Sequence, residues 1–284
     1  MLIISYGWIL CLLKSLLEVR CCVIDVVVVS CETTKNIYYL SPNSFNVKNG
    51  DFVVFEAEDG ELIGKVCRET YQEKNENLDL PLERVLRFAT SEDWNAMAKN
   101  TEIANKALLD ARKMSKSLGL EMNFIDCYYY LDRSQLIFLF LAESRVDFRE
   151  LAKKLAAKYK TRIELRQVGV RDKSKKIGGL GPCGLFLCCN TFLVDFNSVS
   201  INMAKNQMLA LNPSKINGIC GRLLCCLNYE NDTYSELKKD LPKIGFVADT
   251  PLGMGKVVSV DIFKKSYSVD LNEKGIVEFF KDEK

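Results

Sequence analysis

The chain has 284 residues, with 39 Lys and Arg against 37 Asp and Glu, a formal net charge of +2, 12 cysteines and no histidine. Without imidazole, histidine-dependent catalytic triads, Cys/His zinc fingers and His-ligated haem are excluded. An apolar fraction of 48% with 27% charged residues is typical of a globular protein and excludes a disordered chain. The near-neutral total argues against a nucleic-acid-binding protein that acts through bulk electrostatics.

Residues 1–22 form an apolar N-terminal extension. Lys14 and Glu18 interrupt it before it reaches about 20 residues, the length that crosses a membrane. It also lacks the basic start and the small-residue cleavage site of a signal peptide. We therefore predict no membrane span, and a hydrophobic packing helix or a start codon assigned too far upstream explains the segment better.

Residues 23–68 are predicted to form a small N-terminal β-barrel. Short runs rich in Val, Ile and Tyr alternate there with turn residues such as Glu58, Asp59 and Gly60. Residues 69–80 are rich in Glu and Asn and are predicted to be a polar connector.

Residues 81–168 are predicted to form the central α+β domain. A helix opens at Ser91, carries apolar residues at helical spacing and ends at Gly119. Two strands (EMNFIDCYYYL and QLIFLFLA), a helix (VDFRELAKKLAAKYK) and a strand (RIELRQV) follow. This α-β-β-α-β order is typical of a sandwich-like α/β layer with the helices on one face of the sheet.

Residues 169–240 are predicted to be a cysteine-rich helical segment that contains a duplicated motif. At an offset of 37 residues, 181–189 (GPCGLFLCC) and 218–226 (GICGRLLCC) match at six of nine positions, and all three cysteines coincide. Clustering of cysteines in a chain of this length favours a reducing compartment over a secreted disulfide framework. The candidate metal ligands are Cys183, Cys188, Cys189, Cys220, Cys225 and Cys226.

The vicinal cysteines limit how many sulfurs reach one centre. Adjacent residues point in different directions on a helix or a strand, so each pair should present one sulfur. Together with Cys183 and Cys220 this makes four, the number that a structural zinc ion or a four-iron cluster requires. The spacing leaves open which metal binds and which member of each pair is a ligand. Inert core cysteines are the alternative, but duplication at a fixed register argues against it.

Positive charge gathers beside these cysteines. Residues 161–230 carry a net charge of +5, so the rest of the chain carries −3. The basic residues could contact RNA phosphates or an acidic partner surface, or they could only keep a lysine loop in water, and both explanations stay open. The candidate contact residues are Arg166, Arg171, Lys173, Lys175, Lys176 and Arg222.

Residues 241–284 return to short strands and turns and are predicted to form a small C-terminal β-barrel. The predicted fold class is therefore α+β, with a β-barrel at each end, a central α/β layer and a cysteine-rich helical segment between the layer and the second barrel.

Two stretches of the chain resemble a known family. ELRQVGVRDKSKKIGGLGPCG and LCCNTFLVDFNSVSINMAKNQMLALNPSKINGICGRLLCCLNYEND are similar to the bacterial RicT (YaaT) family, whose domain is shared with the yeast polymerase-suppressor protein. The similarity extends from about Val23 to the C-terminus, so the extension 1–22 lies outside it.

The resemblance implies a regulatory, non-enzymatic, cytoplasmic subunit. Members of the family assemble with RicA-like and RicF-like helical partners into a complex that carries four-iron four-sulfur clusters. That complex associates with the endoribonuclease RNase Y, promotes mRNA maturation and affects sporulation and biofilm formation. On this resemblance the six motif cysteines are the cluster candidates, and a cluster shared with partner subunits would use fewer of them. A zinc-stabilised RNA-binding protein is the alternative.

Overall fold

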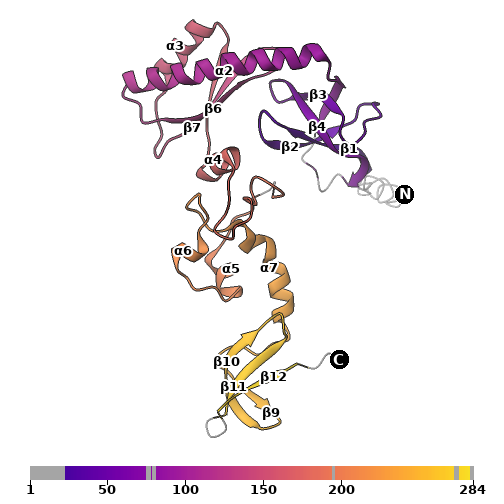
Figure 1. Ribbon diagram of the computed structural model, residues 1–284, viewed down its shortest axis with the longest axis vertical. Helices are drawn as coiled ribbons and strands as arrows, with labels where there is room; N and C mark the ends of the chain where they lie inside the picture. Colours follow the sequence, from indigo (N-terminus) through magenta and orange to yellow (C-terminus); the bar gives the residue numbers. More distant parts are fainter. Residues whose placement is uncertain (1–22, 75–77, 79–80, 194–195, 272–274, 282–284) are drawn as a thin grey trace, which may run out of the picture. The chain divides into compact units, whose positions relative to one another are not determined.

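The computed structural model describes residues 23–74, 78, 81–193, 196–271 and 275–281 (Figure 1). The chain divides into two compact units, residues 1–176 and 177–284. None of the described helices combines the length and the apolar character needed to cross a lipid bilayer. The predicted apolar extension 1–22 lies outside the described residues.

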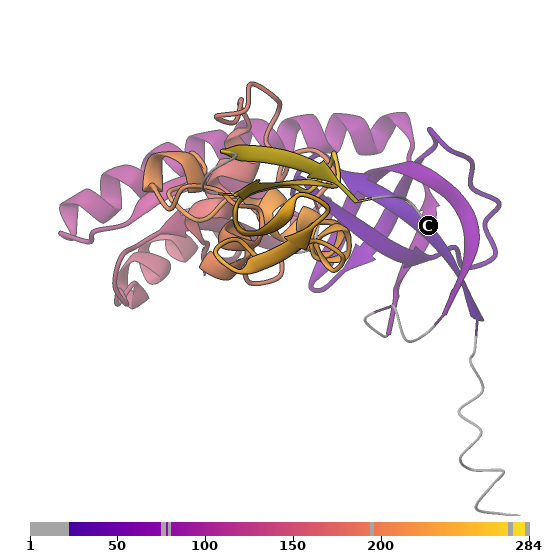
Figure 2. The same ribbon diagram turned by 90° about the horizontal axis from the view of Figure 1, so that it is seen from below.

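The first unit begins with a closed β-barrel, as the sequence predicted. The strand order is β1-β2-β5-β3-β4, and all neighbours are antiparallel except β2 and β5. The indigo and purple strands curve round one another in Figure 2. Alternate side chains point inward, so Val27, Val29, Val53 and Phe55 are fully buried. The strands are β1 (Val23–Cys31), β2 (Asn36–Ser41), β3 (Phe52–Ala57), β4 (Gly60–Lys74) and β5 (Glu83–Phe88).

The barrel strands extend beyond the predicted range 23–68. The exposed second half of β4 pairs with the start of β1, from Val23 with Lys74 to Val26 with Tyr71, so part of the predicted connector is strand. The barrel is closed by β5, which the sequence assigned to the central domain. Exposed strand residues show no alternation of apolar and polar side chains, and Val85 is the one buried residue of β5. Neither the second half of β4 nor β5 could therefore be recognised as a strand from its sequence pattern.

A three-stranded sheet with two helices follows the barrel. The helices are α2 (Ser91–Ser117) and α3 (Arg149–Tyr159), and the strands are β6 (Asn123–Tyr129), β7 (Gln135–Leu141) and β8 (Arg162–Gln167). In the sheet order β6-β7-β8, the first pair is antiparallel and the second is parallel. The predicted order of helix, two strands, helix and strand is confirmed.

The two faces of this sheet belong to different cores. Phe124 and Phe138 pack in one cluster with Ala107 of α2 and Leu151 of α3, which places both helices on the same face. Side chains that alternate with these, including Tyr128, Tyr130 and Ile137, belong to the cluster inside the barrel. The sheet is therefore covered by helices on one face and by the barrel on the other, and the first unit is a single packed body.

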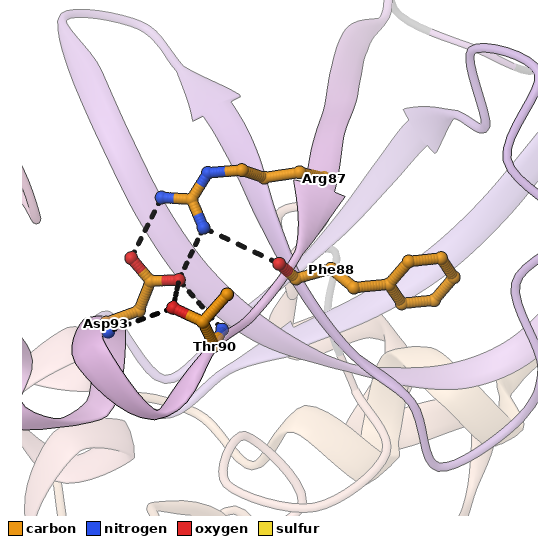
Figure 3. A network of polar contacts seen from close by, with 4 residues as sticks. All are labelled: Arg87, Phe88, Thr90 and Asp93. Carbon is orange, nitrogen blue, oxygen red and sulfur yellow. Dashed lines mark hydrogen bonds and ion pairs between the residues drawn. The ribbon is translucent and has the colours of Figure 1, made fainter.

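A polar network joins the barrel to the start of α2 (Figure 3). Thr90 is the N-cap of α2 and forms a capping box with Asp93. Arg87, on the last barrel strand, binds the Asp93 carboxylate with two nitrogens, one of them at 2.8 Å from Oδ1. The same carboxylate accepts a bond from the Thr90 backbone N–H at 2.8 Å. Helix start and barrel end are thus fixed by one carboxylate that is 8% exposed as a residue.

The turn between β3 and β4 packs directly on the central layer. A Cβ atom added at Gly60 would lie 2.4 Å from Tyr130 Cγ, and the Tyr130 side chain is itself buried. Beside this contact, Leu131 N donates to Glu61 O at 2.8 Å. Only glycine fits at position 60 while this backbone approach is kept.

Replacing Gly60 by alanine is expected to lower the free energy of unfolding by about 1–3 kcal/mol, because the methyl group would overlap a buried ring. Urea denaturation followed by Trp94 fluorescence measures the effect. In a Tyr130→Ala background the same replacement should cost less than about 0.5 kcal/mol, because the ring is gone. An equal cost in both backgrounds would contradict the steric explanation.

The first unit ends with a short basic helix, α4 (Val170–Ile177), which runs to the unit boundary. The sequence predicted a helical segment over 169–240 and offered a solvated lysine loop as one explanation of its basic residues; this stretch is a helix and not a loop. Its side chains bind residues of the barrel, as Lys175 Nζ does at 3.0 Å from Asn36 Oδ1. Long-range contacts of this kind are invisible in the local sequence.

The second unit consists of short helices followed by a sheet. The helices are α5 (Ile201–Asn206), α6 (Pro213–Ile216) and α7 (Cys225–Lys238), and the strands are β9 (Val247–Thr250), β10 (Gly253–Asp261), β11 (Ser266–Asp270) and β12 (Ile276–Phe280). Ala204, Ile216 and Leu227 form the small core of the helical part. Tyr234 of α7 packs edge-on against Phe263 of the turn between β10 and β11, with 5.2 Å between ring centroids.

The predicted C-terminal β-barrel is wrong within the described residues. β9 to β12 form an antiparallel sheet in the order β12-β11-β10-β9, in which the two outer strands do not pair with each other. Val257 and Val269 are buried on one face, whereas Met254 and Phe280 are exposed. Four short strands with one buried face are satisfied by an open sheet, and turn spacing alone does not distinguish this from a closed barrel.

Candidate metal centre

The first copy of the cysteine motif folds into a tight hairpin, here called the first knuckle (residues 180–187). Leu180 and Phe186 form an isolated antiparallel bridge. Gly181 N donates to Leu185 O at 2.8 Å, which brings the two ends of the turn together. Cys183 sits at the exposed tip of this hairpin.

The second copy repeats this geometry at the equivalent positions and is called the second knuckle (residues 217–224). Asn217 and Leu223 form the bridge, and Gly218 N donates to Arg222 O at 2.8 Å. Cys220 takes the place of Cys183. The duplication predicted from sequence is therefore also a duplication of backbone structure.

The glycine after each tip cysteine has a backbone conformation that other residues rarely adopt. Gly184 has φ of +79° and Gly221 has φ of +76°. No heavy atom lies within 4 Å of a Cβ added at either position. The requirement is therefore for the left-handed backbone that closes each turn, and not for space.

The backbone conformation at the vicinal cysteines differs between the two copies. Cys225 and Cys226 open α7, whereas Cys188 and Cys189 lie in a turn outside any helix. The helical segment predicted from sequence is thus helical at the second pair only. Cys225 and Cys226 lie at the N-terminal end of α7, where the helix dipole favours negative charge at nearby sulfurs.

The motif thiols lie in one electrostatic neighbourhood. Burial raises the pKa of the Cys189 thiol, and the nearby Cys225, Cys220 and Cys188 add to this effect. Burial also raises the pKa of Cys226, again with contributions from two thiols of the first copy, Cys188 and Cys183. Both groups are the second members of their pairs. Cysteines of the two copies are therefore close enough to influence one another electrostatically.

The six motif cysteines form no disulfide bonds. Cys183 is exposed and Cys189 is buried, whereas the other four motif cysteines are partly buried. Within the described residues, no group of three or more Cys, Asp or Glu side chains is arranged as a metal site. Six soft thiol donors without histidine fit zinc or an iron–sulfur cluster by their chemistry. Cys31 and Cys127 are buried core side chains, and Cys67 is exposed on β4.

An aromatic pair links the two copies. Phe192 and Tyr229 occupy equivalent positions, each three residues after the second vicinal cysteine, and their rings meet edge to face with centroids 5.1 Å apart. Each side chain is more than half exposed, at 54% and 61%. When the sequences of the two copies are aligned, both residues are aromatic, but only the structure shows that their rings touch.

Replacing Phe192 by alanine is expected to loosen the contact between the copies. An edge-to-face pair contributes about 1 kcal/mol, so its loss should raise the population of the locally open state about fivefold. Alkylation of the buried Cys189 in metal-free protein, followed by peptide mass spectrometry, measures this change. Tyr229→Phe keeps both rings and serves as the control. Unchanged alkylation in Phe192→Ala would refute the role of the pair.

The predicted basic residues fall into two groups. Arg166 pairs with Glu164 and, at 3.1 Å, with Glu58. Lys176 pairs with Asp126 at 2.8 Å and also donates to Thr33 O. Together with Lys175 they lie in the first unit, where Arg171 and Lys173 also lie on α4.

Arg222 lies in the other unit, exposed on the second knuckle. The first knuckle has Leu185 at the equivalent position, and this side chain is 70% exposed. The basic candidates do not all belong to one surface element, and three of them are already bound to other parts of the first unit.

Two protein-family models match separate ranges of the chain. Residues 83–168 match the PSP1 C-terminal conserved region, and residues 198–241 match the third domain of PSP1-like protein. Stage 0 sporulation protein YaaT of Bacillus subtilis (strain 168) is 44% identical over 256 residues, which cover 90% of this chain and 93% of that protein. An uncharacterized protein of Schizosaccharomyces pombe is 26% identical over 156 residues, or 45% of this chain and 21% of that protein. No solved structure matches the chain.

Proposed function

The chain belongs to the YaaT family of PSP1-type proteins, and on that premise we propose that it is a non-enzymatic regulatory subunit whose doubled cysteine motif binds a four-iron four-sulfur cluster. The observation that supports this most is the pair of equivalent knuckles, which gathers thiols from two copies into one neighbourhood. The 44% identity to a stage 0 sporulation protein supports a role in development.

The proposed ligands are Cys183, Cys188, Cys220 and Cys225, two equivalent residues from each copy. Cys183 and Cys220 occupy the knuckle tips. Of the first vicinal pair, Cys189 is buried at 7% exposure, whereas Cys188 is more open. Because burial disfavours the thiolate that a metal needs, the first member of each pair is the better ligand. Cys189 and Cys226 would then pack beside the cluster.

A bound cluster would supply a redox-sensitive cross-link. The residues of this chain would hold it by closing the two turns with Gly184 and Gly221, by joining the copies through Phe192 and Tyr229, and by donating thiolates. Since metal binding contributes folding free energy where ligands from separate segments meet, loss of the cluster would loosen the segment. This would allow the redox state to regulate assembly.

The proposed partners are RicA-like and RicF-like proteins, and the complex would act with RNase Y in mRNA maturation. Apolar side chains at the knuckles support a partner surface beside the thiols. Leu185 and Phe186 are each 70% exposed, and Ile219 is 57% exposed. Exposed apolar groups gathered in this way mark interaction sites. A cluster completed by partner cysteines would use fewer ligands from this chain.

Metal analysis of protein purified without oxygen tests the proposal. Coexpression with the two partners should give a brown complex with the broad visible absorption of an iron–sulfur chromophore and stoichiometric iron. A colourless complex that contains zinc and no iron would refute it.

The alternative function is a zinc-stabilised RNA-binding protein. The interval between Cys183 and Cys188 is four residues, the upper end of the spacing in structural zinc sites. In that case the isolated protein should bind RNA with a steep salt dependence, and Lys173→Gln with Arg222→Gln should reduce the salt slope. These two residues are the suitable targets because Lys175 and Lys176 have structural partners in the first unit.

A further inference from the structure

A second candidate site lies in the first unit and contains none of the motif cysteines. A pocket of about 200 Å³ is bounded by the turn between β1 and β2, by the central sheet and by α4. Ile125, Leu139 and Val168 contribute its apolar wall. Its charged lining is dominated by cations, with Asp172 as the one carboxylate among four basic side chains: Lys35, Arg166, Lys175 and Lys176.

The cations are held in position by groups behind the pocket. Glu58 and Glu164 bind Arg166, Asp126 binds Lys176 and Glu32 binds Lys35, and none of these carboxylates is among the residues that line the pocket. Ion pairs at a partly solvated surface are weak, and Lys and Arg keep further N–H donors that a second anion can use. The result is a set of preorganised donors that face a common space.

Neutral donors complete the lining. Thr34 and Tyr128, which both carry a hydroxyl group, are among the residues that line the pocket. Burial raises the pKa of Tyr128, so its phenol keeps its proton at neutral pH. The ammonium group of Lys176 lies 5.9 Å from the centroid of the Tyr128 ring, which fixes these two side chains beside each other.

Size limits what can bind there. Sites for drug-sized ligands typically measure about 300–1,000 Å³, and one water takes about 30 Å³. A bound single strand of RNA would instead need an extended groove with stacking aromatics. We propose that this pocket binds a small phosphate monoester, with the phosphate at the cations and a short carbon skeleton against the apolar wall. Lys and Arg are the residues that recognise phosphate oxygens in this way.

Titration of the full-length protein tests the proposal, with inorganic phosphate and glycerol 3-phosphate as probes and glycerol as the uncharged control. Ionic strength is held constant so that general screening does not change. Both phosphate probes should bind saturably. Lys175→Gln should weaken binding about tenfold, the effect of losing one charge-assisted bond. Lys173→Gln changes the same charge on the same helix but lies outside the pocket lining, and should change affinity less than about twofold.

These titrations can either support or overturn the phosphate-binding proposal. Absence of saturable binding in the wild type, or equal weakening in the two lysine variants, would overturn the proposal. If Lys175→Gln lowers the melting temperature, Lys35→Gln replaces it, with Lys48→Gln outside the lining as its control. Cys220→Ser should keep full phosphate affinity, so failure of the cluster proposal and failure of this one are separately visible.

Discussion

Replacing Cys188 by serine is expected to abolish the iron content of the complex, whereas replacing its neighbour Cys189 should leave most of it. The two residues share one backbone turn but differ in burial. Serine removes a soft thiolate ligand at position 188, and at position 189 it only replaces a buried side chain of similar size. Iron content per protein and visible absorption of the anaerobic complex measure the contrast.

The second copy should behave in the same way, with Cys225→Ser losing iron and Cys226→Ser keeping it. Cys67→Ser is the matched control, since Cys67 is exposed on β4 outside the motif. Equal iron loss at both members of each pair would refute the proposed ligand set while leaving cluster binding intact. Full iron content in all four motif variants, at positions 188, 189, 225 and 226, would refute the motif as the cluster site.

Replacing Asp93 by alanine is expected to lower the stability of the first unit by about 2–3 kcal/mol. Loss of a helix cap costs about 1 kcal/mol, and removal of one partner from a partly buried ion pair adds to that cost. Arg87 is 45% exposed and can return to water, which keeps the total below that of a fully buried pair. Urea denaturation followed by Trp94, in the first turn of α2 beside Phe52, reports on this junction.

The effect depends on pH in a defined direction. The Arg87 guanidinium, with the backbone and hydroxyl of Thr90, holds the pKa of Asp93 well below its ordinary value, although burial opposes this. A depressed folded pKa gives stability that is complete above the unfolded value of about 3.9 and lost as pH falls below it. The difference between wild type and Asp93→Asn should therefore be constant from pH 8 to 5 and shrink below about pH 4. Glu92→Gln, in the same helical turn, is the control.

Elements with a hydrophobic period could be predicted from sequence, and elements without one could not. The helix predicted between Ser91 and Gly119 is observed as α2, whose apolar spacing and terminal signals agree. The second half of β4 and all of β5 are stabilised by strands that lie elsewhere in the sequence, and their own residues are mostly exposed. The C-terminal strands were recognised, but whether a sheet closes depends on pairing between its outer strands.

The same difference holds for the candidate site: the repeated motif could be predicted from sequence, and the contacts between distant residues could not. Duplication at a fixed offset predicted that the two cysteine copies are equivalent, and the equivalent hydrogen bonds agree. The basic residues were predicted as a group, but their partners lie far away in the chain. Glu58, for example, is 108 residues before Arg166. Lys35 has no sequence signal of its own, and only the packing of the β1–β2 turn against the sheet brings it to the phosphate pocket.

The parallel pairing of β2 with β5 has a consequence for synthesis of the chain. Leu40 pairs with Glu83, so the barrel cannot close until the ribosome has made the segment that leads into α2. Until then β2 and β3 would expose unpaired edges, the feature that promotes association between chains. Contacts of such long sequence separation also slow folding. The barrel and the central layer are therefore expected to fold late and together, and a fragment ending near residue 68 should aggregate.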